Sequence, residues 1–268
     1  MREAAALTVE ELAEQARRLE PAQLDLLREM TESLLRPNME YLKPDSDLIS
    51  NGFGESFLNR LKIHHATSDE KFKKGSFEYA FVAAAKFAGR RARKTTSNTH
   101  QGADVLIDEV RWSLKTEAAA SISRTGIRIS KFSEARWIRD CPDEYRAERA
   151  RERIYKHLSE YERIATLRAF TAGRNTIQYD LVEIPLNLLK SVRNLKQNDF
   201  RGKLNGTGVG SGGSALVFQL NGKKAFSLKL DNSVEKITLS GIPVSDCILH
   251  ASWRVEFPPE LVDVDNDE

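Results

Sequence analysis

The sequence predicts a mixed α/β (α+β) fold, in which a central mixed sheet is flanked by helices. Three observations support this prediction. The first third of the chain carries helical patterns, two alternating segments near the middle are joined as a hairpin, and the last third is a run of strand-like segments. Because helices and strands do not alternate regularly, a repeated β–α–β architecture is not expected.

Composition limits the possible classes of protein. With 40% hydrophobic residues in 268, the chain can bury one sizeable core. The net charge of +2 does not by itself indicate a nucleic-acid binder. The N-terminus is too acidic for a signal peptide, and no segment approaches the roughly 18 apolar residues of a membrane span. Two cysteines without metal-ligand spacing, Cys141 and Cys247, favour a reduced, bacterial cytoplasmic location with no membrane contact.

The chain divides into an N-terminal helical element, 1–45, and a main domain, 46–268. Two helices are expected within 7–36: Thr8 and Glu11 form a capping box, and Pro21 suits the first turn of the second helix. The pair is expected to pack on the main core; the alternative is a dimer arm. Asn51-Gly52 then predicts a turn.

The middle of the chain alternates between predicted helices and short strands. A helix capped by Ser76 is expected within 68–91, followed by a basic and polar loop up to residue 102. Later predicted elements are strands at 103–107, 110–116 and 126–130, a helix over 131–138, and a long charged helix over 143–172 that leaves His157 exposed.

The last third is predicted to be rich in strands. A strand at 176–185 and a short helix at 186–192 precede strands at 215–220, 224–230, 235–240 and 248–257. The Gly-rich segment 206–214 lacks the Gly-Lys-Ser/Thr of a phosphate-binding loop. It is either a loop that orders on a ligand or a plain connection.

The hairpin is the segment that carries chemistry. If it turns at Asp108-Glu109, Ile107 faces Val110 and Asp104 faces Ser113. Directly opposed side chains in such a pair lie about 5 Å apart. The two strands therefore predict that an aspartate and a serine meet on one face of the sheet.

The same face also carries a lysine and a glutamate. Strand side chains alternate, so Ser113, Lys115 and Glu117 lie on one side, near Asp104. A carboxylate binds Mg²⁺, and a neighbouring lysine can position water and offset phosphate charge. This arrangement suits a Mg²⁺-dependent phosphodiesterase, although a solvated surface hairpin would show the same residues.

The order aspartate, hairpin, acid-x-Lys resembles the PD-(D/E)XK nucleases, which include most type II restriction endonucleases. Asp104 matches the first acid and Lys115 the lysine of that pattern. The sequence departs from it at Ser113, where most members carry Glu or Asp, and at Ala103, where many carry Pro. A subgroup of these enzymes has Ser-x-Lys and takes the missing carboxylate from a following helix. The resemblance implies a restriction-endonuclease-like sheet and Mg²⁺-dependent cleavage of DNA.

The resemblance also implies which residues take part. Glu78 matches an upstream helical glutamate, and Glu134 would replace the missing acid, with Glu117 as the nearer alternative. The segments GADVLIDEVRWSLKTE and ISKFSEARWIRDC are similar to ApaLI-like restriction endonucleases. The expected catalytic residues are Glu78, Asp104, Ser113, Lys115 and Glu134, and the expected metal ligands are Asp104 with Glu134 or Glu117.

Basic and polar residues between the helix and the hairpin are candidates for contacting DNA. The basic ones would meet phosphates, and the polar loop suits base edges. The alternatives are cations that favour a helix C-terminus and an ordinary polar loop. The candidates are Lys86, Arg90, Arg91, Arg93, Lys94, Asn98, His100 and Gln101.

These expectations favour a type II restriction endonuclease. It would bind double-stranded DNA as a homodimer, because two-fold symmetry matches a palindrome, and a cognate DNA methyltransferase would protect the host. The alternatives are a repair or recombination nuclease on the same core and a non-enzymatic DNA-binding protein.

Overall fold

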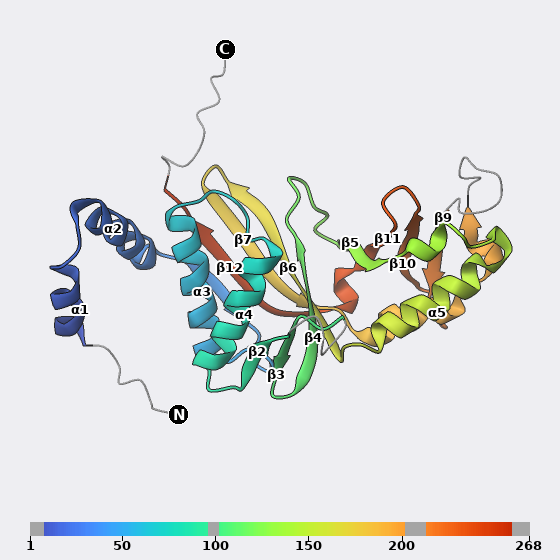
Figure 1. Cartoon of the computed structure of the whole chain (residues 1–268), viewed down its shortest axis with the longest axis horizontal. Coiled ribbons are helices and arrows are strands. Elements are labelled where there is room, and N and C mark those ends of the chain that lie inside the picture. The colour runs from blue at the N-terminus through green and yellow to red at the C-terminus, as the bar shows by residue number, and fades with distance from the viewer. Residues whose placement is uncertain (1–7, 96–101, 202–212, 259–268) are drawn as a thin grey trace, which may run out of the picture.

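The computed structural model describes residues 8–95, 102–201 and 213–258. Its elements form an elongated molecule in which a helical pair, a large sheet with two helices and a second sheet follow one another (Figure 1). A mixed sheet flanked by helices confirms the predicted fold class. In the described ranges, no helix is both long and apolar enough to cross a membrane.

The large sheet forms the centre of the molecule. Its strands lie in the order β1-β12-β7-β6-β4-β3-β2, and only the neighbours β4 and β6 are parallel. Their bounds are β1 (Met39–Leu42), β2 (Ala92–Lys94), β3 (Val105–Ile107), β4 (Val110–Glu117), β6 (Arg163–Gly173), β7 (Thr176–Glu183) and β12 (Ile248–Glu256). Helices α3 (Asn51–Ala66) and α4 (Lys74–Phe87) cover one face, where aromatic rings such as Phe57 and Trp253 stack at 4.8 Å.

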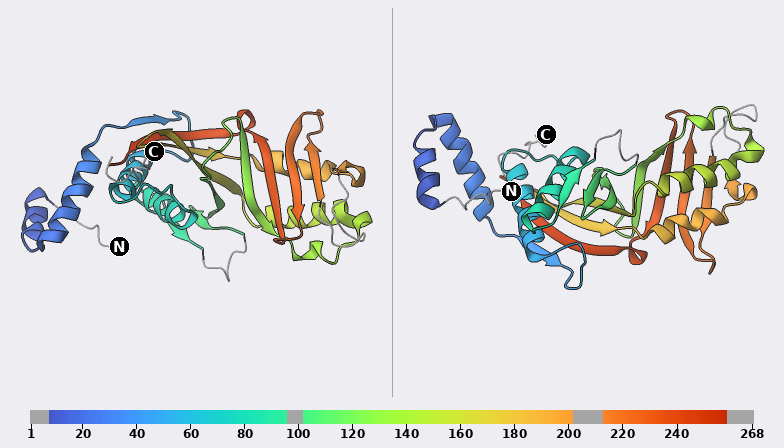
Figure 2. Two further views of the ribbon diagram at one scale, coloured as in Figure 1. Left: turned by 90° about the horizontal axis from the view of Figure 1, so that it is seen from above. Right: turned by 60° about the horizontal axis from the view of Figure 1, so that its bottom comes forward.

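The second sheet lies at the end of the molecule opposite the N-terminal helices (Figure 2). Its order is β5-β11-β10-β9-β8. The bounds are β5 (Gly126–Glu134), β8 (Phe200–Arg201), β9 (Gly213–Phe218), β10 (Lys224–Asp231) and β11 (Lys236–Pro243), with helices α5 (Arg146–Leu158) and α6 (Leu186–Leu189) beside them. A second core joins this sheet and α5 to Ile164 and Val182 of the large sheet. The two sheets are therefore held together by packed apolar side chains.

The N-terminal helices α1 (Val9–Ala16) and α2 (Pro21–Leu35) form as predicted, and the capping box between Thr8 and Glu11 is confirmed. The expectation that the pair packs on the core is wrong. No side chain of α1 is buried and only Ser33 of α2 is. Contact is limited to the end of α2, where the Lys62 ammonium on α3 donates to the carbonyls of Leu34 and Arg36. Unpaired carbonyls at a helix end attract such a donor.

Three local predictions before the hairpin are wrong. Asn51-Gly52 begins α3 rather than a turn, because the Ser50 hydroxyl caps that helix by accepting from the Phe53 amide. Helix α4 follows Lys73, so Ser76 lies inside it. The basic segment predicted as a loop contains β2, and β1, within the predicted helical element 1–45, pairs with β12.

The predicted helix over 143–172 is correct only in its first half. Helix α5 ends at Leu158, and β6 occupies 163–173 as a central strand parallel to β4. Every residue from 164 to 170 is buried, because one face meets the α3–α4 core and the other meets the second core. A short apolar run buried on both faces does not distinguish a strand from a helix by its periodicity.

The predicted helix over 131–138 is wrong as well. Strand β5 continues to Glu134 because its pairing with β11 shifts register near Ile237 and again near Leu239. Phe132 is buried beyond the first shift. The strands predicted in the last third are confirmed, although β12 joins the large sheet while β9, β10 and β11 form the second.

Candidate active site

The hairpin has the register that the sequence predicted. Ile107 pairs with Val110 and Val105 pairs with Trp112. Asp108 and Glu109 have φ angles of 48° and 69°, the left-handed conformation that a tight two-residue hairpin requires. The turn therefore places Asp104, just before β3, opposite Ser113.

The Asp104 carboxylate is fixed at the end of β3. Its Oδ2 accepts from the Leu114 amide at 2.6 Å and from the Ser113 hydroxyl at 3.3 Å. Its Oδ1 accepts from the Lys74 ammonium of α4 at 2.7 Å. One carboxylate oxygen is thus held by the hairpin, and the other meets a cation.

Lys74 joins Asp104 to a second carboxylate. Its ammonium is 3.6 Å from Glu78 Oε1, and Glu78 Oε2 is 2.8 Å from the Lys94 ammonium on β2. The Glu78 side chain is only 13% exposed, so it depends on these cations. Sequence reasoning missed Lys74, although its position one helical turn before Glu78 was a usable signal.

Lys115 lies on the same face of the sheet as Ser113, beside Thr166 of β6. Burial lowers the pKa of Lys115 to about 8; the Asp104 charge opposes this shift and the Lys74 charge adds to it. Asp104 and Lys115 therefore lie on one side of the sheet within electrostatic reach of each other.

Lys115 lines a cleft of about 610 Å³ between β4, β5 and α5. The lining comprises Lys74, Gly102, Lys115, Lys131, Phe132, Ser133, Glu134, Trp137, Arg153, Lys156, His157 and Glu160. Five of these residues are lysine or arginine and two are glutamate, so the cleft is suited to an anion. The cations of α5 were not predicted, and His157, predicted to be exposed, is only 15% exposed.

The two predicted replacement acids differ. Glu134 borders the cleft from strand β5, is 64% exposed and forms an ion pair with Lys131 at 2.7 Å. Glu117 is buried, and its carboxylate accepts from the Arg168 guanidinium at 2.7 Å and from the Arg128 amide at 3.0 Å. Both oxygens of Glu117 are engaged, which argues against it as a metal ligand. Among the described residues, no three His, Cys, Asp or Glu side chains form a ready metal cluster.

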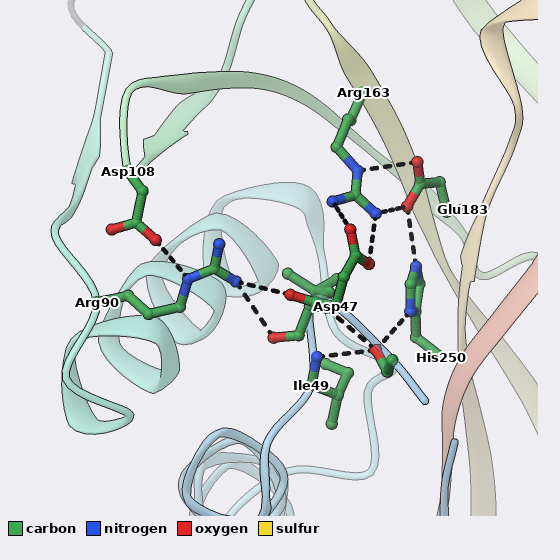
Figure 3. A network of polar contacts seen from close by, with 9 residues as sticks. Asp47, Ile49, Arg90, Asp108, Arg163, Glu183 and His250 are labelled. Atoms are coloured by element: carbon green, nitrogen blue, oxygen red, sulfur yellow. Dashed lines mark hydrogen bonds and ion pairs between the residues drawn. The ribbon is translucent and has the colours of Figure 1, made fainter. Parts of the chain in front are cut away.

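A second group of charges lies at the turn end of the hairpin and contains Arg90 (Figure 3). Arg90 Nε donates to Asp108 at 2.7 Å, and its terminal nitrogen reaches the Leu48 carbonyl at 3.4 Å. Close by, Arg163 pairs with Asp47 and Glu183. Arg90, predicted to bind DNA, is therefore engaged in the connection between loop and sheet.

The other predicted DNA-binding residues are placed unevenly. Lys86, Arg91 and Arg93 are exposed, and with Arg90 they line a hollow of about 560 Å³ at the edge strand β2. This hollow shares no lining residue with the Lys115 cleft. The predicted contacts Asn98, His100 and Gln101, and residues 206–212 of the Gly-rich segment, lie outside the described residues.

Comparison with known proteins agrees with the site. The SmaI family, described as type II site-specific deoxyribonuclease, matches residues 13–255. The type II restriction enzyme SmaI of Serratia marcescens is 34% identical over 220 residues, which cover 82% of this chain and 86% of that enzyme. No solved structure matches the chain.

These matches decide between the expectations from sequence. They cover most of the chain, including both sheets and the hairpin. They name the SmaI family, so the narrower resemblance to ApaLI-like enzymes is not supported. A repair nuclease and a non-enzymatic DNA-binding protein are likewise replaced by one class of enzyme. The chain belongs to the SmaI family of type II site-specific deoxyribonucleases.

Proposed function

We propose that this deoxyribonuclease hydrolyses both strands of duplex DNA at a short palindromic sequence in a Mg²⁺-dependent reaction at Asp104 and Lys115. The observation that carries the proposal is the placement of these two side chains on one face of the sheet, bordering a cationic cleft. Lysines and arginines along the cleft are suited to DNA phosphates. The carboxylates are suited to the metal.

The donor set around Asp104 fits a divalent cation. In this structure the Lys74 ammonium is shared by Asp104 and Glu78, so the two carboxylates already face one positive charge. Mg²⁺ usually binds one or two carboxylates together with waters and phosphate oxygens. Asp104 and Glu78 would hold it, and Glu134 borders the same cleft as a further carboxylate. The metal would stabilise the negative charge that develops on the phosphate.

Lys115 would act on the phosphate and the attacking water. With a pKa of about 8, it is mainly protonated at neutral pH and can neutralise phosphate charge or orient water by donating hydrogen bonds. Ser113 would serve Asp104: its hydroxyl donates to Oδ2 and fixes the orientation of the carboxylate. These roles place the enzyme in the PD-(D/E)XK superfamily, with serine where most members carry an acid.

The expected assembly follows from the substrate. A palindrome has two-fold symmetry, so a homodimer would offer one active site to each strand. The products would be 5′-phosphate and 3′-hydroxyl ends. In the bacterial cytoplasm, a cognate DNA methyltransferase would have to protect the host's own sites.

Phage DNA digestion tests the proposal. Wild type should give discrete fragments with Mg²⁺ and none with EDTA. Lys115→Ala and Asp104→Asn should each lower the single-turnover rate by at least about 100-fold, because each removes a group that acts on developing charge. Arg93→Ala, at the separate hollow, is the matched control and should cleave normally.

Circular dichroism of each variant should show an intact fold, so that lost cleavage reports on chemistry. Cleavage by wild type in EDTA would exclude the metal, and normal cleavage by Lys115→Ala would exclude the site. Fragments whose ends share no palindrome would exclude the symmetric substrate.

A further inference from the structure

His157 is a titratable group in the cleft to which the proposed chemistry gives no role. It lies in the last turn of α5, and its side chain borders the same cleft as Lys115. The ring is held edge-on by Phe132 at 4.8 Å and by Tyr161 at 5.3 Å between centroids. It is therefore a fixed group in the wall of the cleft.

The two ring nitrogens of His157 are in different situations. Nδ1 lies 2.9 Å from Glu160 Oε2. An ionised carboxylate only accepts hydrogen bonds, so Nδ1 carries the proton and Nε2 presents a lone pair. Nε2 is buried and has no hydrogen-bond partner in the part of the chain that the structure describes. An unpaired buried polar atom costs about 1–3 kcal/mol, so its persistence beside a cleft indicates a partner that arrives with a ligand.

Glu160 also connects this pair to the loop before Asp104. Gly102 has a φ of +80°, and a Cβ built there would lie 2.2 Å from Glu160 Oε2. The Glu160 carboxylate therefore rests against the backbone two residues before Asp104. His157 is oriented by a residue that is itself packed against the metal-binding loop.

The charges around His157 favour its neutral form. Burial lowers the pKa of His157, the Lys115 charge lowers it further, and Glu160 opposes both effects. Besides Glu160, the charged side chains that line the cleft are Lys74 from α4, Lys115 from β4, Lys131 and Glu134 from β5, and Arg153 and Lys156 from α5. Because cations outnumber acids, the imidazole is uncharged at neutral pH and able to accept a proton.

We propose that His157 is a catalytic residue whose Nε2 accepts a proton from the water that attacks the scissile phosphorus. The proposal rests on the nuclease site at Asp104 and Lys115. The water oxygen forms its bond to phosphorus as the bond to the 3′ oxygen breaks, and the 3′ oxygen takes a proton from solvent. The imidazolium, stabilised by Glu160, then returns its proton to solvent. A base held in place by a carboxylate is a recurring catalytic arrangement.

The test compares two substitutions of His157 in single-turnover cleavage of duplex DNA. His157→Gln preserves a polar side chain but cannot accept the proton, and His157→Ala leaves space for free imidazole. Each should cleave at least about 100-fold more slowly, with DNA affinity in Ca²⁺ within a few fold of wild type. Imidazole should restore part of the His157→Ala rate and none of the Lys115→Ala rate. His64→Ala, whose ring bonds the Glu70 carbonyl outside the cleft, is the control.

The pH profile gives a second measurement. Wild-type cleavage should fall at acid pH as the imidazole takes up a proton, and this acid limb should be missing from the residual activity of His157→Gln. Normal cleavage by His157→Gln, or failure of imidazole to rescue a folded His157→Ala, would overturn the role of His157 alone. Absence of cleavage by wild type with Mg²⁺ would instead overturn the nuclease site on which it rests.

Discussion

Two groups of charged residues lie a few residues apart along the parallel strands β4 and β6, and they are built differently. In the group around Arg163, charges are paired: its guanidinium forks between Asp47 and Glu183 and stacks over the Trp112 ring at 4.2 Å. His250 completes the group with a 2.9 Å bond to Glu183 (Figure 3). In the cleft around Lys115, by contrast, cations outnumber acids and the described partners do not balance them.

This difference separates a structural ion network from a binding site. Burial raises the pKa of Glu183, but bonds from His250 and Arg163 more than compensate and leave it below its usual value. Charges satisfied in this way hold elements together. The desolvated charge of Lys115 opposes folding and is retained for the substrate.

Breaking the paired group should have the largest effect on stability. Arg163→Ala leaves Glu183, only 11% exposed, with one partner fewer and removes the contact with Trp112. We expect a loss of about 3 kcal/mol in the free energy of unfolding, measured by urea denaturation. Arg93→Ala, at an exposed edge, should lose less than about 0.5 kcal/mol. Equal losses in both variants would remove the distinction between the two groups.

Removing a charge from the cleft should have the opposite sign. Lys115→Met keeps the length of the side chain and relieves the burial of an ammonium group. We expect a gain of about 1 kcal/mol in EDTA, together with loss of cleavage. A destabilised Lys115→Met would show that the lysine is structural.

The pH dependence sharpens this result. Below pH 8 Lys115 is charged in both the folded and the unfolded chain, so its burial cost is constant. Above about 8, its pKa in the folded state, the folded chain loses the proton first, the unfolded chain holds more protons, and wild-type stability rises. The advantage of Lys115→Met should therefore shrink between about pH 7 and pH 9 in parallel denaturation curves. A constant difference would contradict the assignment.

The smallest effect concerns two exposed lysines. Lys156 borders the cleft and Lys86 borders the separate hollow at β2. If Lys156 meets a phosphate, Lys156→Ala should reduce the slope of log affinity against log salt by about 0.9, whereas Lys86→Ala should not change it. Binding of a short duplex in EDTA measures both. Equal changes would extend the DNA footprint to the β2 edge.

The hairpin could be predicted from sequence because its information is local. Alternation fixes which face Ser113 and Lys115 share, and the turn at Asp108-Glu109 fixes what lies opposite. Strand β6 could not be predicted this way. Its apolar run reflects burial between two cores that form only when distant segments meet, and the same residues also match a helix.

The cleft shows the same limit for side chains. Lys74, His157 and Glu134 come from α4, α5 and β5, and only tertiary packing brings them to one cleft. His157 did carry a local signal, since Ile154 and Tyr161 lie on the same side of the chain at helical spacing and are both buried. Glu134 was singled out correctly as a candidate near the site but with the wrong element, because the register shifts of β5 leave no mark in the sequence.

The pairing of β1 with β12 has a consequence for biosynthesis. These strands come from opposite ends of the chain, and β12 also pairs with β7, which leads through β6 to the strand of Lys115. Such long-range pairings form late, because closing large loops costs entropy before contacts repay it. A ribosome-bound chain that has not yet released residues 248–256 therefore has an unfinished sheet, and we expect it to leave the host chromosome uncut.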